Sequence, residues 1–271
     1  MSIFREIETN DRPKFKSEAG AKRFVGKFFG MKEMQMLSDP DKMPEFAFNI
    51  PAQECKAGAH MVDLEGFICH DCYALPDVDE NGKRLSNRGG RYKFNVVQEA
   101  LYRRFEFAMN NSYFIDVMSH LIGKKVKEKF RWFDSGDLQS EKMLDDICKV
   151  CRNTPHILHW LPTKEWKMAE KYIMSGNKIP RNLDLRLSAL KVDGDPPYAL
   201  AKRLGLNTST VMSPEVWEKF VATKEKGIRC PSSLNDNKCG TCKACWTDEV
   251  VNVGYKGHDL RPKLIQIKHK G

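Results

Sequence analysis

Short apolar runs alternate with amphipathic segments along the second half of the chain. We predict strands and helices in turn at residues 130–138, 140–153, 156–164, 165–176, 182–190, 196–205, 206–212 and 213–227. Ser140 and Ser213 precede two of these helices as N-caps, and Gly176 could terminate a third. The alternation is typical of parallel strands that are joined by crossover helices.

The first half of the chain is less regular. Residues 45–52 alternate between apolar and polar side chains, which predicts a strand that could open the same sheet. Helices are expected at residues 21–29, 94–111 and 112–129. Residues 55–93 show no sustained periodicity of apolar and polar positions, and we interpret them as one long loop.

These elements indicate an α/β fold with five or six parallel strands, crossover helices and cysteine-rich loops. The strands would form a partial or distorted barrel, or an open doubly wound sheet. In both, functional residues gather at the carboxyl ends of the strands. We divide the chain into an N-terminal polar segment at 1–44, an α/β domain at 45–228 with a cysteine loop at 55–72, and a C-terminal cysteine-rich, cluster-binding segment with a basic tail at 229–271.

Polar residues follow several predicted strands and could converge on one crevice. The candidate catalytic residues are Asp134, Ser135, Asp137 and Lys164, and the candidate cofactor-binding residues are Thr163, Arg186 and Ser188. Such a set could bind a polar ligand or move protons. In the alternative interpretation, residues 135–137 form a turn and helix cap, and Lys164 is solvated.

The composition is that of an ordinary soluble globular protein, with 30% charged and 41% hydrophobic residues. No apolar run approaches the roughly 20 residues that span a bilayer, and the N-terminus lacks an apolar signal core. We therefore expect no membrane association and a cytoplasmic location. The net charge of +9 suits a nucleic-acid partner, but the basic residues are spread out, and we prefer solvated helix faces as their explanation.

The chain has nine cysteines, and structural disulfides are rare in a reducing cytosol. Metal binding is the leading explanation for so many cysteines there. Cys148 and Cys151 are an exception. With Leu144 and Ile147 they fall on one apolar stripe of a predicted helix, and we interpret them as core residues.

The stretch RCPSSLNDNKCGTCKACW contains four cysteines, which are Cys230, Cys239, Cys242 and Cys245. Zinc prefers two separated C-x2-C pairs, whereas bacterial ferredoxins combine a C-x2-C-x2-C run with a remote Cys-Pro. The sequence has that run, with Cys230-Pro231 preceding it. We predict a [4Fe–4S] cluster here. Zinc and free thiols remain the alternatives.

A second group consists of Cys55, Cys69 and Cys72 in the predicted long loop. Three cysteines leave one ligand position of a metal centre open. It could be filled by another side chain, by a cysteine shared with the C-terminal group, or by a substrate. His60 and His70 lie in the same loop and could ligate a metal, although a solvated loop residue is the preferred interpretation of His70. We predict a second cluster, or a share in one cluster. Buried thiols are the alternative.

The segments IPAQEC…CHDCYA, FRWFDSGD, HWLPTK and RCP…CGTCKACW resemble the phage "gene product 88" family over about residues 45–246. The resemblance implies a cysteine-rich, phage-encoded iron–sulfur protein acting in the host cytoplasm. A looser likeness is to radical S-adenosylmethionine (SAM) enzymes, which place three cysteines after the first strand of a partial barrel. Their spacing is C-x3-C-x2-C, whereas the first gap here is thirteen residues, and no glycine-rich SAM motif is evident.

Three classes of function remain open. The first is a redox or regulatory iron–sulfur protein with a host protein or redox partner. The second is a radical-SAM-like enzyme with an open iron that binds SAM. The third is a zinc-stabilised module that binds nucleic acid in a salt-sensitive manner. We favour the first slightly over the second.

Overall fold

The computed structural model describes residues 13–41, 43–70, 72–75, 77–78, 84–85, 90–224 and 226–257. The predicted basic tail beyond residue 257 lies outside this range. No helix in the described residues is long and apolar enough to cross a membrane.

The centre of the fold is a seven-stranded sheet in the order β1-β4-β5-β6-β7-β9-β8. The strands are β1 (Ala47–Phe48), β4 (Lys129–Trp132), β5 (Leu158–Thr163), β6 (Leu183–Ser188), β7 (Asn207–Met212), β8 (Ile228–Arg229) and β9 (Asn252–Lys256). All neighbouring strands are parallel, and the sheet does not close. From β1 to β7 the spatial order follows the chain without reversal. This confirms the predicted α/β class and favours the partial barrel over the doubly wound sheet.

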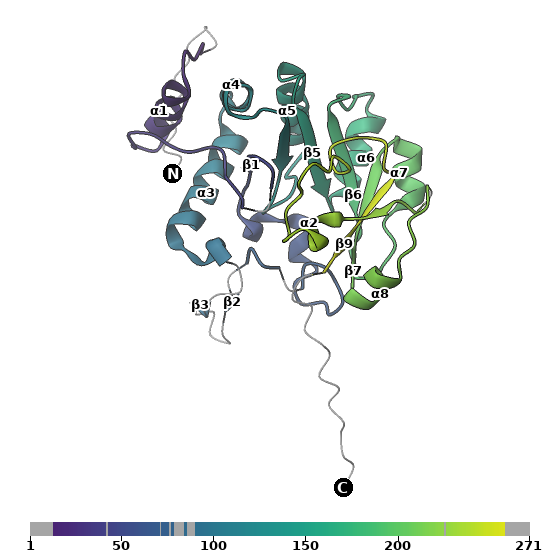
Figure 1. Ribbon diagram of the computed structural model, residues 1–271. Coiled ribbons are helices and arrows are strands. Elements are labelled where there is room, and N and C mark those ends of the chain that lie inside the picture. The colour runs from purple at the N-terminus through teal and green to yellow at the C-terminus, as the bar shows by residue number, and fades with distance from the viewer. Residues whose placement is uncertain are drawn as a thin grey trace.

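Helices connect the strands as the sequence pattern predicts (Figure 1). They are α1 (Glu18–Phe28), α2 (Lys56–Ala59), α3 (Asn95–Asn110), α4 (Phe114–Lys125), α5 (Glu141–Asn153), α6 (Trp166–Met174), α7 (Tyr198–Leu204) and α8 (Pro214–Lys219). Ser140 and Ser213 are N-caps, with Oγ accepting from the Met143 and Val216 N–H groups. Gly176 has the left-handed φ of 88° that ends a helix. Helix α8 ends at Lys219, earlier than the predicted 227.

Short elements occupy segments that the sequence pattern left irregular. The predicted long loop contains the 3-10 turns η1 (Ala52–Glu54) and η2 (Gly90–Lys93), helix α2, and the antiparallel pair β2 (Asp77–Val78) and β3 (Arg84–Leu85). A third 3-10 turn, η3 (Pro231–Leu234), follows Cys230. Strands β8 and β9 are not among the predicted strands, because two residues are too few to show a period and β9 carries Asn252 and Gly254. The domain boundaries stay a prediction, but β9 belongs to the sheet.

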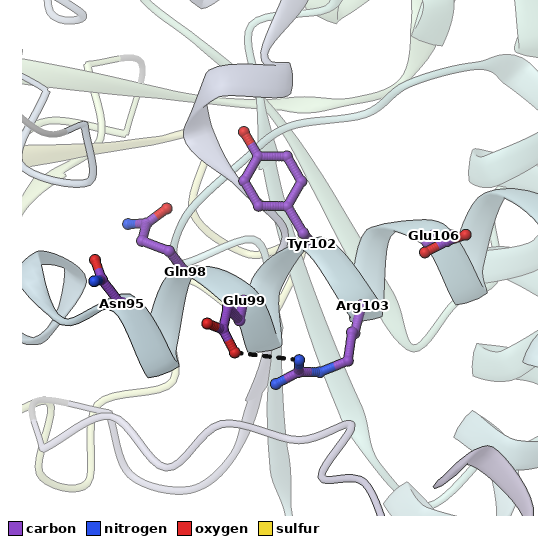
Figure 2. A pocket seen from close by; sticks show the side chains of 6 residues that line it. All are labelled: Asn95, Gln98, Glu99, Tyr102, Arg103 and Glu106. Atoms are coloured by element: carbon purple, nitrogen blue, oxygen red, sulfur yellow. Dashed lines mark hydrogen bonds and ion pairs between the residues drawn. The ribbon is translucent and has the colours of Figure 1, made fainter. Parts of the chain in front are cut away.

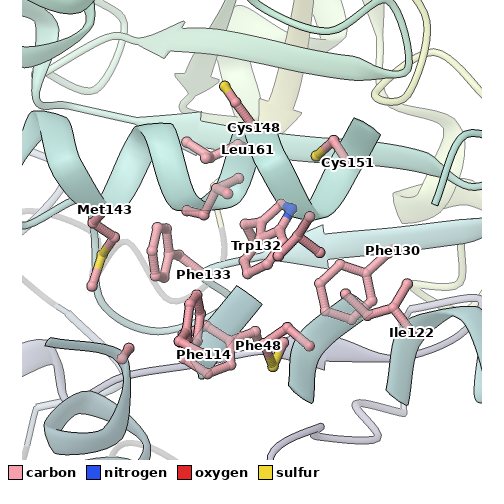
Figure 3. Packing of buried hydrophobic residues seen from close by; sticks show 14 of the residues in the cluster. Phe48, Phe114, Ile122, Phe130, Trp132, Phe133, Met143, Cys148, Cys151 and Leu161 are labelled. Atoms are coloured by element: carbon pink, nitrogen blue, oxygen red, sulfur yellow. The ribbon is translucent and has the colours of Figure 1, made fainter. Parts of the chain in front are cut away.

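The two faces of the sheet are covered by different kinds of side chain. On the helical face, aromatic and aliphatic residues from β1, β4 and β5 pack against α4 and α5 (Figure 3). Phe48, Phe130 and Trp132 are buried there with Leu161. Cys148 and Cys151 are fully buried in the same cluster, which confirms that they are core residues. The side chains that alternate with these point to the other face, which is polar and aromatic.

His159 is a neutral histidine inside the helical core. Its side chain is fully buried, and the Trp132 Nε1–H donates to His159 Nδ1 at 3.3 Å. Nδ1 is therefore the acceptor, and Nε2 carries the proton that it shares with Thr154 Oγ1 at 2.9 Å. Burial lowers the pKa of His159 to about 3.

Acid should therefore destabilise the fold through His159. Between about pH 6.5 and 3, the unfolded histidine binds a proton that the folded one does not, so the free energy of unfolding falls as pH falls, by up to about 1.4 kcal/mol per pH unit. Urea unfolding at pH 7 and pH 5 should show a smaller pH dependence for His159→Gln than for wild type. His156→Gln, at an exposed histidine, is the control. Equal pH dependence in wild type and His159→Gln would contradict the assignment.

Candidate functional site

The C-terminal cysteine segment lies on the polar face of the sheet, opposite the helical core. Four hydrogen bonds hold it there. Lys129 Nζ donates to the Cys242 carbonyl at 3.1 Å, and Trp246 Nε1 donates to the Phe130 carbonyl at 3.1 Å. Arg186 Nη2 donates to the carbonyls of Ala244 and Thr247 at 2.6 and 3.2 Å. The segment is thus fixed by the Lys129 and Arg186 side chains of β4 and β6 and by its own Trp246 side chain.

These contacts gather the four C-terminal cysteines into one cluster, formed by Cys230, Cys239, Cys242 and Cys245 with Trp160, Ala244, Trp246, Val253 and Tyr255. We call it the cysteine cluster. Cys230 directly follows β8, and its N–H donates to the Gly254 carbonyl at 2.7 Å. Cys245 Sγ lies 3.1 Å from Tyr255 Oη, and Cys230 Sγ lies 3.1 Å from Ser232 Oγ. Residues that are fifteen positions apart in sequence therefore meet in space.

Cysteine thiolates, the residue type gathered in the cysteine cluster, are ligands that thiophilic metals prefer. All four cysteines are free thiols rather than disulfides. Burial raises the pKa of Cys245 to about 12 and also raises the pKa of Cys239, which makes buried thiolates costly without a cation. In the described part of the chain, no group of three or more His, Cys, Asp or Glu side chains is already arranged to hold a metal ion.

The other three cysteines lie near the carboxyl end of β1. A Cβ on Gly58 would lie 3.6 Å from Cys69 Sγ and 3.8 Å from Cys55 Sγ, so these two thiols share the space beside α2. Burial raises the pKa of Cys55, and the charges of Asp137, Cys72 and Cys69 raise it further. His70 is exposed, with Nδ1 2.8 Å from the Val62 carbonyl, as expected of a solvated loop residue.

Asp137, Thr163 and Lys164 meet beside this N-terminal cysteine group. The buried Asp137 carboxylate accepts from Thr163 Oγ1 at 2.6 Å and from the Lys164 N–H at 2.9 Å. Burial raises the pKa of Asp137, and the Lys164 ammonium opposes that rise. The turn that places Asp137 needs Gly136, because its φ is 88° and a Cβ there would lie 2.2 Å from Ile50 Cγ1.

Asp134 forms a separate network. Its carboxylate accepts from Arg91 Nη2 and Tyr92 Oη, each at 2.8 Å, and from Arg131 Nη1 at 3.2 Å. The hydroxyl of Tyr73, which directly follows Cys72, donates to the Asp134 carbonyl. Burial acts to raise the pKa of Asp134, but the two arginines and Tyr92 outweigh it and lower the pKa. Asp134 therefore serves as the anionic centre of a polar network.

The remaining candidates lie apart from Asp137. Ser135 Oγ donates to the Ile50 carbonyl at 3.0 Å, and Ser188 Oγ lies 3.0 Å from Ser209 Oγ. Arg186 is fully buried under the cysteine cluster. The seven predicted residues thus form several local groups. Their catalytic and cofactor-binding roles stay predictions.

Several residues at these sites were not identified from the sequence. Lys129 and Tyr255 contact the cysteine cluster, and Arg91, Tyr92 and Tyr73 contact Asp134. Only Tyr73 carries a local signal, because it directly follows the C-x2-C pair. The others come from elements that are distant in sequence.

A hollow of about 440 Å³ lies along one face of α3 (Figure 2). It is lined by Asn95, Gln98, Glu99, Tyr102, Arg103 and Glu106. Arg103 Nη1 donates to Glu99 Oε2 at 3.4 Å, as an ion pair one helical turn apart. All of its lining residues come from one helix, and none of them is a cysteine.

Comparison with known protein families gives a match over most of the chain. The model of the family described as gene product 88 matches residues 8–248. The chain belongs to the gene product 88 family. This confirms the phage family that its cysteine motifs resemble. No curated protein and no solved structure matches the chain.

Arg186 should be essential for holding the cysteine cluster on the sheet. Arg186→Met removes the donors to Ala244 and Thr247 and leaves the buried Asp184 without its ion-pair partner, 2.7 Å away. We expect a loss of about 3 to 5 kcal/mol in the free energy of unfolding, measured by urea denaturation. Hydrogen exchange should show faster exchange of the amides in residues 239–247.

The matched control is Arg203→Met, which removes an exposed arginine from its ion pair with Glu170. Its expected cost is below about 1 kcal/mol, with unchanged exchange in residues 239–247. If both variants lost the same stability, Arg186 would not have the anchoring role.

Proposed function

We propose that this member of the gene product 88 family is an iron–sulfur protein with a redox or regulatory role in the cytoplasm of the host cell. Cys230, Cys239, Cys242 and Cys245 would hold a [4Fe–4S] cluster. The observation that supports this is their assembly into one part-buried cluster on the polar face of the sheet. Tertiary contacts thereby bring the remote Cys230 to the closely spaced run.

Iron–sulfur chemistry suits these residues better than zinc. Three thiols separated by two residues each, with a Cys-Pro outside the run, follow the ferredoxin pattern rather than two separated pairs. When bound, such a cluster supplies one-electron transfer. The chain contributes burial against Trp246, and the cations of Lys129 and Arg131 offset the negative charge of the thiolates.

A redox or regulatory centre of this kind needs a partner. We favour a host protein or redox partner over nucleic acid, since the net charge of +9 is spread along the chain. A zinc-stabilised nucleic-acid-binding module is the alternative that metal analysis separates.

Anaerobically purified protein should contain iron and acid-labile sulfide in equal amounts and absorb near 400 nm. About four irons per chain would indicate one cluster and about eight would indicate two. Cys242→Ser should remove the C-terminal cluster's iron, whereas Cys148→Ala, at a buried core thiol, should retain it. A colourless protein with stoichiometric zinc and no sulfide would refute the proposal.

A second candidate function rests on the N-terminal cysteines. Cys55, Cys69 and Cys72 follow the first strand of an open parallel sheet and lie beside Asp137 and Lys164. Three thiols would leave one iron of a cluster open to a ligand. This arrangement favours a radical-SAM-like enzyme with S-adenosylmethionine as the cofactor, despite the long gap between the first two cysteines.

Binding of SAM to anaerobically reconstituted protein tests this candidate by isothermal titration calorimetry. One equivalent should bind to wild type and none to Cys69→Ser. Lys164→Ala should weaken binding about tenfold if its ammonium pairs with the SAM carboxylate. The Cys148→Ala control should bind like wild type. Failure of the iron-loaded wild-type protein to bind SAM would exclude the radical-SAM-like function.

A further inference from the structure

Two buried N–H donors beside the cysteine cluster lack an acceptor. Among the described residues, Trp160 Nε1 and Arg131 Nε have no hydrogen-bond partner. The Trp160 side chain is only 5% exposed, so water does not readily replace the missing acceptor. A buried donor left unpaired is destabilising, and buried polar groups are nearly always satisfied.

Most other tryptophans do have acceptors. Trp246 Nε1 donates to the Phe130 carbonyl, and Trp166 Nε1 donates to the Ser188 carbonyl at 2.9 Å. Trp132 Nε1 donates to His159. Trp217 Nε1 is also unpaired in the described structure, but its ring lies under the cations of Arg229 and Lys256 and is not part of the cysteine cluster.

Arg131 and Trp160 form one unit at this place. They are register partners on β4 and β5, and the guanidinium carbon lies 4.5 Å from the Trp160 ring centroid. The Trp160 ring lies 5.3 Å from that of Trp246 and 6.1 Å from that of Tyr255. Tyr255 in turn contacts Cys245 Sγ. Both unpaired donors therefore belong to the wall against which the cysteines pack.

Cysteine sulfur atoms are acceptor groups of the cluster to which Trp160 belongs. The Trp160 ring packs in the same cluster as Cys245, with Cys230, Cys239 and Cys242 at its margin. Thiolate and sulfide sulfurs accept hydrogen bonds, and the strength of these bonds is one of the main controls on the potential of an iron–sulfur cluster. The Asp134 carboxylate does not satisfy Arg131 Nε, because it accepts from Nη1.

We propose that Trp160 Nε1–H and Arg131 Nε–H are hydrogen-bond donors to sulfur atoms of the metal centre held by the cysteine cluster, and that they raise its reduction potential. The inference rests on the proposed iron–sulfur function. Donation to sulfur withdraws electron density and stabilises the more negative, reduced state. Neither residue is a ligand. Both tune the centre from the adjacent strands.

Trp160→Phe is the direct test, because it keeps an aromatic ring in the cysteine cluster and removes the indole N–H. Iron and sulfide content should stay at the wild-type level. The equilibrium constant for one-electron reduction, measured by mediated redox titration, should fall roughly tenfold, which corresponds to the loss of one charge-assisted hydrogen bond.

Trp166→Phe is the matched control. It removes an indole that lies outside the cysteine cluster and whose N–H already donates to a backbone carbonyl, so its reduction equilibrium should stay within about twofold of wild type. Arg131→Lys retains the positive charge and removes Nε–H. It should shift the equilibrium in the same direction as Trp160→Phe, and it serves as the test if Trp160→Phe does not fold.

The outcomes separate the inference from the proposed function. Wild-type protein without iron and sulfide would overturn both. Normal iron and sulfide with unchanged reduction equilibria in Trp160→Phe and Arg131→Lys would overturn only the inference. An equal shift in Trp160→Phe and Trp166→Phe would also overturn it, because a general loosening of the fold would then explain the change.

Discussion

The buried guanidinium of Arg186 is the interaction on which the rest of the arrangement depends. It donates to Asp184 on its own strand, to the Thr208 carbonyl on β7, and to Ala244 and Thr247 in the cysteine segment. A fully buried arginine is tolerated only when its charge and donors are satisfied, and here the C-terminal segment provides part of that satisfaction. The sheet and the cysteine segment therefore stabilise one another.

A polar network joins the two cysteine groups. Arg131 pairs with Asp134 and stacks on Trp160, which belongs to the cysteine cluster. Tyr73 follows Cys72 and donates to the Asp134 carbonyl. A neighbour of each group thus contacts the same part-buried ion pair, although the cysteines come from opposite ends of the chain. The environments still differ, since the N-terminal group lies beside Asp137 and Lys164 and the C-terminal group beside cationic residues.

Local periodicity was enough to predict most of the fold. The strand–helix alternation after residue 130 appears in the structure, with Ser140 and Ser213 as caps, because capping and amphipathicity depend on neighbours within one helical turn. The same reasoning separated Cys148 and Cys151, on the apolar stripe of α5, from the loop cysteines. Local periodicity did not predict strand β9, because its place between β7 and β8 depends on pairing with strands distant in sequence.

The sequence by itself determined the fold class, the family motifs and the residue types that could bind metal, since these depend on short-range pattern and spacing. Tertiary structure alone decided which residues meet. It brought Cys230 to the run that begins at Cys239, put Asp137 with Lys164 beside the N-terminal cysteines, and assigned Arg186 to anchoring. The physical reason is that strand order and burial decide which distant side chains become neighbours, and neither is encoded in local periodicity.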